Sequence, residues 1–472
     1  MLFSSMLFLW VFLPIVLLGN AILPKRWINP FLVIASLVFY AWGEPVYVLI
    51  MLTSIGVNYL AGRMLSRART PKQKKWIVLV DVTVNLSMLF CFKYLALAAE
   101  TVNAVCHLLT GYKQVMHVPQ IALPIGISFF TFQGLSYVVD VYRGEVEPQK
   151  KLIHVALYIS FFPQLIAGPI VRYKDISEQI VKRHVTLERF SEGIRRFIYG
   201  LAKKVLISNV LAGCADKLYA YDISTQMDGV MAWCAALMYA FQIYYDFSGY
   251  SDMAIGLGKM FGFEFAENFN YPYMSRSIRE FWRRWHISLS TWFREYVYIP
   301  LGGNRKGTKR TYCNLLMVFF LTGIWHGAGY GFVIWGLYHG FFSIVERVGF
   351  GRILSRHPLL SRVYLFFTVV FGWVFFRLEN LWDTMFALKR MILPWQYPLA
   401  MQPRMYLNFH VVLTWLAAFA GMGIIQCILK KTGLADRLRN SPFEAVYLML
   451  LMVLCISALA SNTYNPFIYF KF

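Results

Sequence analysis

Long apolar stretches recur along the whole chain, and they constrain its fold more than any other feature. Hydrophobic residues make up 58% of the 472 residues and charged residues only 15%, which is far from the composition of a soluble domain. The stretches that are long enough to cross a bilayer as helices lie at 3–23, 28–62, 76–99, 121–139, 152–170, 196–213, 229–246, 312–345, 362–377, 409–429 and 443–461. With 28–62 forming a hairpin, about eleven or twelve crossings are predicted. We therefore expect residues 1–472 to form one all-α, polytopic integral-membrane domain.

Basic residues beside the first stretches predict the orientation of the chain. No basic residue precedes the apolar core of 3–23, no small-residue cleavage site follows it, and Lys25 and Arg26 come directly after it. This pattern favours a retained span over a signal peptide. Because basic residues favour the cytoplasmic side, the N-terminus is expected outside, and the basic loop 63–75 is expected inside.

The excess of basic residues does not by itself indicate binding of nucleic acid. Lys and Arg number 46 against 24 Asp and Glu, but they are spread over short loops between apolar stretches. Membrane lipid is therefore the expected partner and nucleic acid is not. A second interpretation is that some of the excess Lys and Arg residues attract the phosphates of a coenzyme that acts as the acyl donor. Seven isolated cysteines without CxxC spacing predict neither disulfides nor a metal site.

The region of about 120–345 mixes apolar stretches with Gly, Pro, Trp and charged residues, so we expect the catalytic centre there. Within it, the segment 277–300 is too charged to cross lipid and too aromatic for a solvated loop. Trp282, Trp285, Leu289 and Trp292 follow one another at steps of three or four residues. This periodicity predicts an amphipathic helix buried in the protein or lying at the interface.

Two neighbouring patterns have less specific interpretations. The segment 301–307, which contains Asn304 and Arg305, reads as a glycine-rich basic turn and lacks the spacing of a nucleotide-binding loop. Asp246 and Asp252 end an apolar stretch, and we expect them to bond to the basic helix 277–300 rather than to hold a metal. Pro163, Gly168 and Pro169 predict a broken helix in 161–173.

His326 is the strongest candidate for chemistry. It lies in an uncharged, glycine-rich run of membrane-spanning character, where ionisable side chains are costly and usually mark a site. A neutral imidazole can take a proton from a hydroxyl or thiol near neutral pH, and a second one, His286, could position the donor or stabilise developing charge. No Gly-x-Ser-x-Gly motif is present, so direct transfer to an external hydroxyl is favoured over a covalent enzyme intermediate.

Four motifs resemble the membrane-bound O-acyltransferase (MBOAT) family. They are 284–294 (RWHISLSTWFR), 299–306 (IPLGGNRK), 325–340 (WHGAG followed by WGLYHG) and 165–172 (LIAGPIVR). Within the family, the likeness is greatest to the alginate O-acetyltransferase branch of bacterial polysaccharide acetylation proteins. It covers nearly the whole chain.

The resemblance implies a function and a set of site residues. By this resemblance, His326 matches the family's active-site histidine and is expected to act as the base. His286 matches the second histidine of the bacterial branch and is expected to position the donor. The family implies tilted helices around a central tunnel, which Trp285, Trp325, Asp246, Asn304 and Arg305 are candidates for lining. In the implied reaction an acetyl group is moved from a cytoplasmic thioester, which is expected to be acetyl-CoA. Acetyl-CoA would be a substrate, and no bound cofactor or metal is expected. The acceptor would be an extracytoplasmic polysaccharide such as alginate, or a partner acetyltransferase protein, at a bacterial plasma membrane.

Three alternatives stay open at this point. The D-alanyl transfer proteins of teichoic acid modification share the motif at 284–294, although 167–173 and 301–306 look more like the polysaccharide branch. A transporter of an acylated sugar or lipid would use His326 as a proton relay, but no internal repeat is visible. A scaffold that only anchors another enzyme leaves the intramembrane histidine unexplained.

Overall fold

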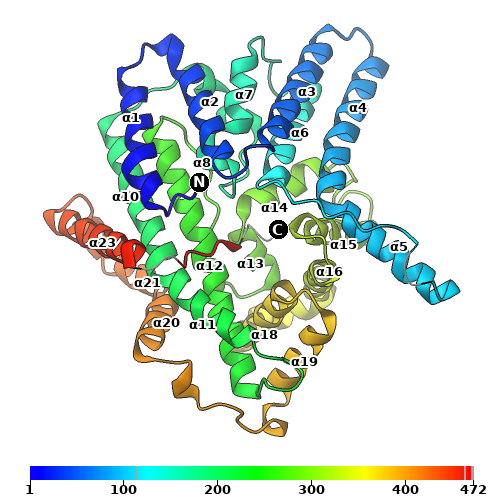
Figure 1. Cartoon of the computed structure of the whole chain (residues 1–472), viewed down its shortest axis with the longest axis vertical. Coiled ribbons are helices and arrows are strands. Elements are labelled where there is room, and N and C mark those ends of the chain that lie inside the picture. Colours follow the sequence, from blue (N-terminus) through cyan, green and yellow to red (C-terminus); the bar gives the residue numbers. More distant parts are fainter. Residues whose placement is uncertain (113–114, 462–463, 469–472) are drawn as a thin grey trace. The chain divides into compact units, whose positions relative to one another are not determined.

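The computed structural model describes residues 1–112, 115–461 and 464–468, and these residues form helices and connecting segments without a strand (Figure 1). Two compact units account for them. Unit 1 consists of 1–2, 7–193 and 257–266, and unit 2 of 3–6, 194–256 and 267–472. Helices α10 (Leu187–Ala202) and α12 (Gly229–Met260) run from one unit into the other. The expected all-α class is confirmed.

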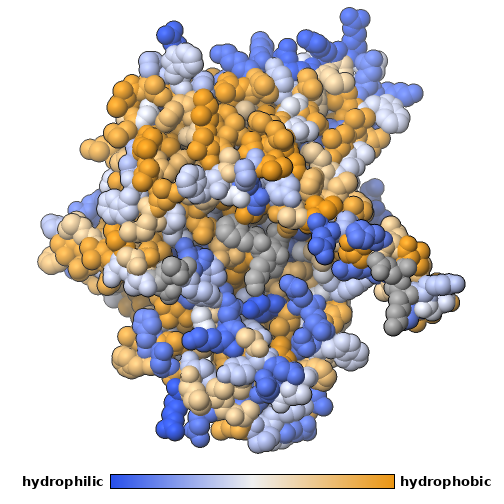
Figure 2. Space-filling model, in the orientation of Figure 1, coloured by the Kyte–Doolittle hydropathy of each residue, from blue (hydrophilic) through white to orange (hydrophobic). Residues whose placement is uncertain are grey.

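Unit 1 is built from packed helices with apolar outer faces. α3 packs against α4 and α6, and α2 packs against α7. Large apolar side chains such as Trp10, Ile15 and Leu18 are exposed, and Figure 2 shows hydrophobic side chains gathered over α1 and α2. Its helices are η1 Phe8–Phe12, α1 Leu13–Ile22, α2 Lys25–Ala41, α3 Val48–Arg67, α4 Pro71–Leu89, η2 Phe90–Tyr94, α5 Leu95–Thr110, α6 Ile127–Arg143, α7 Leu152–Ser160, α8 Phe162–Leu165 and α9 Tyr173–Val181.

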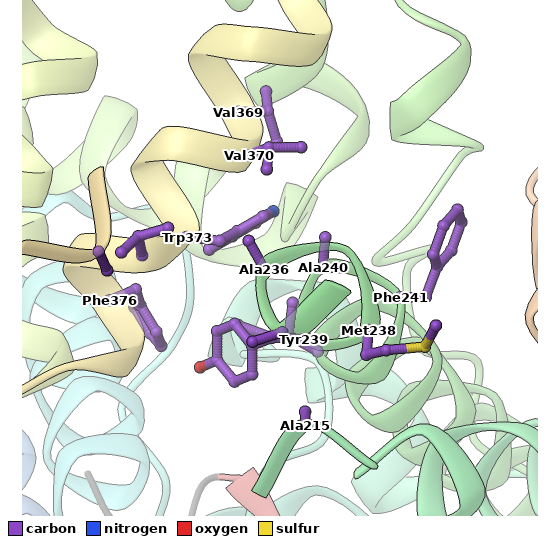
Figure 3. Close-up of a cluster of buried hydrophobic side chains, with 14 of the residues drawn as sticks. Ala215, Ala236, Met238, Tyr239, Ala240, Phe241, Val369, Val370, Trp373 and Phe376 are labelled. Atoms are coloured by element: carbon purple, nitrogen blue, oxygen red, sulfur yellow. The ribbon is translucent and has the colours of Figure 1, made fainter. Parts of the chain in front are cut away.

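Unit 2 contains the aromatic core around which the candidate site is built. Ala236 of α12 is small, and Trp373 of α18 lies beside it in the buried cluster (Figure 3). Its remaining helices are η3 Lys203–Ser208, α11 Asn209–Tyr219, η4 Pro272–Met274, α13 Ile278–Arg284, α14 Ile287–Phe293, η5 Arg294–Tyr298, α15 Thr308–His326, α16 Tyr330–Val345, η6 Glu346–Phe350, α17 Gly351–Arg356, α18 Pro358–Arg377, α19 Leu381–Ile392, η7 Pro394–Gln396, η8 Pro403–Met405, α20 Phe409–Gly421, α21 Ile424–Lys431, α22 Leu434–Leu438 and α23 Pro442–Ser461.

Uninterrupted apolar helices are fewer than the predicted eleven or twelve crossings. In the described part of the chain, five helices are long and apolar enough to span a bilayer, or six if the pair α20 and α21, bent by 49°, counts as one span. Other apolar stretches are divided into shorter helices. The stretch 152–170, for example, breaks at Phe161, as its proline and glycine residues predict. The polytopic class is confirmed, but the described residues do not show eleven or twelve helices that could each span a bilayer.

The apolar run 312–345 is two helices rather than one span. α15 ends at His326, the chain turns at 327–329, and α16 returns along α15 (Figure 1). The two helices approach so closely that a Cβ on Gly336 would overlap the carbonyl oxygen of Phe319 and lie 3.2 Å from the Cα of Gly323. Glycine is required where two backbones come this close.

The predicted amphipathic helix 277–300 is also broken. Two short helices, α13 and α14, meet at His286, whose φ of 46° lies in the left-handed region. Few residues other than glycine adopt this conformation, so the surrounding contacts must hold it. The regularly spaced tryptophans therefore belong to two short helices and do not form one face of a continuous helix.

The expected partners of Asp246 and Asp252 were wrong. Asp246 forms an ion pair of 2.7 Å with the buried Lys204, and Asp252 binds Arg196 and Lys203 at 2.6 Å each. All three cations lie on the chain 194–208 and none on 277–300. The sequence interpretation missed them because this segment was counted as an ordinary apolar span, whereas buried carboxylates need cations wherever the fold supplies them.

Replacement of Gly336 by Ala should push α15 away from α16. Overpacking of this kind typically costs about 1–3 kcal/mol, so we expect a lower melting temperature for the purified protein in detergent. Gly329→Ala is the matched control, because its Cβ would meet the Phe332 ring at an ordinary 3.6 Å. Equal melting temperatures for the two variants would contradict the close contact of the helices.

Candidate active site

His326 ends α15 and points into an aromatic pocket of unit 2. Its side chain is buried, and its ring centroid lies 5.1 Å from that of Trp335 and 5.1 Å from that of Phe376. Trp335 comes from α16 and Phe376 from α18. The return of α16 along α15 therefore encloses the histidine on one side, while α18 encloses it on another.

His286 reaches the same pocket from the break between α13 and α14. It is buried, and the edge of Phe247 from α12 packs on its ring at 4.6 Å between centroids. Its Nδ1 lies 3.1 Å from Oδ1 of Asn268, another buried side chain. The left-handed backbone conformation at His286 lies at the break between α13 and α14, from which the ring enters the pocket.

The structure brings the two histidines together. Their ring centroids lie 6.4 Å apart, and Trp325 contacts both, at 6.0 Å from His286 and 4.9 Å from His326. At this separation the ring nitrogens of the two imidazoles are too far apart for a direct hydrogen bond. Trp325, predicted from its motif, therefore forms a shared wall of the site.

The other predicted site residues divide into two sets. Trp285 supports the pocket from behind, packing against Phe281 at 5.5 Å and Trp373 at 4.8 Å. Asp246 contacts neither histidine, because its carboxylate binds Lys204 and accepts the backbone N–H of Ile468 at 2.9 Å. Its position indicates a structural role in holding the segment 464–468.

Asn304 and Arg305 lie in the predicted glycine-rich turn and not beside the histidines. Asn304 accepts hydrogen bonds from the Tyr298 hydroxyl and, at 3.5 Å, from Arg347. Arg305 is exposed, and its backbone N–H donates to Gly302. Positive φ values at Gly302 and Gly303 confirm the turn.

Several residues of the pocket carried no signal in the sequence. Asn268 lies in an irregular segment with no motif, and Phe247 and Phe376 look like ordinary span residues. Phe376 also lines a cavity together with Phe332, Gln242 and Arg377. The intramembrane histidine and the resemblance at 284–294 and 325–340 drew attention to this part of the chain, but neither identified Asn268, Phe247 or Phe376.

The arrangement suits proton transfer in a site that excludes water. Aromatic rings surround both imidazoles, and a neutral imidazole has one nitrogen that can accept a proton. Within the described residues, no three His, Cys, Asp or Glu side chains gather as possible metal ligands. The two buried imidazoles are the groups of this pocket that can accept or donate a proton.

Comparison with known proteins agrees with these features. The model of the membrane-bound O-acyltransferase family matches residues 70–362, more than half of the chain. A probable alginate O-acetylase AlgI of Pseudomonas putida is 40% identical, with all of both chains covered. The corresponding protein of Pseudomonas aeruginosa is 46% identical over 81% of this chain and 73% of its own.

Relatives with other described activities are also similar. A peptidoglycan O-acetyltransferase of Helicobacter pylori is 35% identical over 83% of this chain and 80% of its own, and a teichoic acid D-alanyltransferase of Bacillus subtilis is 30% identical over 46% and 56%. Together with the apolar helices and the histidine pair, these matches show that the chain belongs to the membrane-bound O-acyltransferase family and is a multi-pass O-acyltransferase.

Proposed function

We propose that the protein moves an acetyl group from acetyl-CoA on the cytoplasmic side to hydroxyl groups of an extracytoplasmic polysaccharide, directly or through a partner acetyltransferase protein, in a bacterial plasma membrane. The observation that carries this proposal is the pair of buried imidazoles 6.4 Å apart. One of them accepts the hydroxyl proton as the oxygen attacks the thioester carbonyl. The C–S bond then breaks, and the thiol leaves.

The relatives favour acetyl over D-alanyl as the group transferred. Proteins described as O-acetylases or an O-acetyltransferase match 81–100% of this chain at 35–46% identity. The D-alanyltransferases match 46–47% of it at 27–30% identity. Alginate is the proposed acceptor because the two alginate O-acetylases are 40% and 46% identical to this chain, against 35% for the peptidoglycan O-acetyltransferase, so peptidoglycan is the second candidate.

His326→Ala should abolish most of the acetyl transfer, because it removes one imidazole from the site. Loss of a group that accepts the proton or stabilises the developing charge typically lowers rates about 10²- to 10⁴-fold. The measurement is O-acetylation of the cellular polysaccharide, normalised to the amount of the variant in the membrane. His357→Ala removes an exposed histidine and is the control. Undiminished acetylation by His326→Ala would exclude this histidine from the mechanism.

A cluster of arginines in unit 2 supports a phosphate-bearing donor. Arg279 and Arg283 are exposed on α13 and, within the described residues, form no ion pair. Partial burial, Arg283 and Arg347 all lower the pKa of the Arg279 guanidinium. The nearby Glu346 does not balance the cluster fully, because its carboxylate also accepts the backbone N–H groups of Ile278 and Arg279 at 2.5 and 3.2 Å.

The position of this cluster fits the length of the proposed donor. Arg283 precedes His286 by three residues, so at most about 10 Å of chain separates their Cα atoms. The pantetheine arm of CoA joins its diphosphate to its thioester and can bridge such a distance. Guanidinium groups bind phosphates through paired, charge-assisted hydrogen bonds.

Arg283→Gln should weaken use of acetyl-CoA more than use of acetyl-pantetheine, which lacks the phosphates. Loss of one charge-assisted hydrogen bond predicts a KM for acetyl-CoA about tenfold higher, with a smaller difference in high salt. Thiol release by the purified protein measures both donors, and Arg356→Gln, an exposed arginine on α17, is the control.

An equal effect on both donors would contradict phosphate binding by Arg283. Binding of an acylated carrier protein by the wild type, with no use of acetyl-CoA, would instead support D-alanyl transfer.

A further inference from the structure

Asn268 connects the irregular segment after α12 to the break that carries His286. Its side chain is fully buried. Its backbone carbonyl accepts the N–H of Ile287 at 3.0 Å, and two residues later the N–H of Asn270 donates to the carbonyl of Arg284 at 2.9 Å. The two segments are therefore fastened to each other on both sides of His286.

The hydrogen bonds of the Asn268 side chain settle which way its amide faces. The backbone N–H of Ser288 lies 3.2 Å from one amide atom, and the Ser288 hydroxyl lies 2.8 Å from the same atom. A backbone N–H only donates, so this atom is the oxygen Oδ1. The amide nitrogen then donates to the hydroxyl of Ser251 at 3.0 Å.

This orientation fixes the proton on His286. Nδ1 of His286 lies 3.1 Å from the same oxygen, which can only accept a hydrogen bond. Nδ1 is therefore the nitrogen that carries the proton. In a neutral imidazole the other nitrogen, Nε2, is then an acceptor. Nε2 is buried and, among the described residues, makes no hydrogen bond.

We propose that Asn268 is a positioning residue that holds His286 as its Nδ1–H tautomer, so that Nε2 of His286 accepts the proton of the acyl-acceptor hydroxyl. This rests on the proposed acyl transfer and deepens it. The hydroxyl proton moves to Nε2 as the O–C bond forms and the C–S bond breaks. The imidazolium then returns the proton to the leaving thiolate, which gives an ester and a free thiol.

The roles differ from those that the sequence suggested, where His326 was the base and His286 only positioned. A His286 ring held in this tautomer cannot donate from Nε2 to a developing oxyanion, because Nε2 carries no proton. The ring centroid of His326 lies 6.4 Å from that of His286. The contribution of His326 is then to orient or stabilise the reacting acyl group.

Asn268→Asp tests this assignment through the pH dependence of kcat. A carboxylate keeps the hydrogen bond to Nδ1 and favours the imidazolium, so it should raise the pKa of His286 by about 1–3 units. The base is then unprotonated only at higher pH, and the acid limb of the kcat profile should move upward by the same amount. Asn268→Ala should lower kcat about 10- to 100-fold with little change in KM, as losses of a histidine's hydrogen-bond partner commonly do.

Ser290→Ala is the matched control, because its hydroxyl binds the carbonyl of Trp282 and touches neither Asn268 nor His286. An acid limb that stays in place in a folded, active Asn268→Asp variant would overturn the assignment of His286 as the proton acceptor. A merely structural role for Asn268 would lower the amount of folded protein without moving the limb.

The tautomer itself can be observed without any activity. In protein labelled with ¹⁵N-histidine, the nitrogen shifts that His286→Asn removes should show a protonated Nδ1 and an unprotonated Nε2. The opposite pattern would overturn the proposal even in a variant too unstable to assay. If the pattern is as expected but the wild type releases no thiol from acetyl-CoA, the proposed donor is wrong and the assignment of the tautomer stands.

Discussion

The rest of the site depends on one interrupted helix. α13 and α14 stop and start at His286, whose left-handed backbone is sterically unfavourable for a residue with a Cβ. Asn268 holds this conformation, because its Oδ1 accepts hydrogen bonds from Nδ1 of His286 and from the backbone N–H of Ser288. In a continuous helix, the helical periodicity would set the direction of the imidazole. The break instead allows the ring to enter the pocket where α15 ends.

The position of His326 depends on a second feature, the close antiparallel packing of α16 against α15. Glycines at 323 and 336 allow the two backbones to touch, and this contact sets the position of His326 at the end of α15. Trp335 and Phe376 then enclose the ring. Asp246 and Lys204 are both buried in the same unit, and each ion compensates the charge of the other.

Much of this organisation could be predicted from the sequence. Hydropathy identified a helical membrane protein, and the motifs around His286 and His326 selected the two rings that the structure brings together. The breaks at His286 and at 327–329 could not be predicted with the same certainty, because a run of apolar residues has the same hydropathy whether it is one helix or two.

Contacts between segments that are distant in the sequence could not be predicted either. Asn268 has no motif, and its role depends on a pairing of irregular backbone that no periodicity reveals. Likewise, Asp246 was assigned to the wrong cation because Lys204 lies within an apolar stretch. Polar residues inside apolar segments find partners according to the packing of helices, which local sequence patterns do not encode.

The central claim is that the two buried histidines act as one unit in acyl transfer. The most direct test is a double-mutant cycle of thiol release from acetyl-CoA by purified protein, with His286→Asn, His326→Asn and the double variant. Residues that act as a unit give non-additive losses. We expect the double variant to be about as slow as the slower single variant. Losses that multiply, so that the double variant shows the product of the two single effects, would contradict the account.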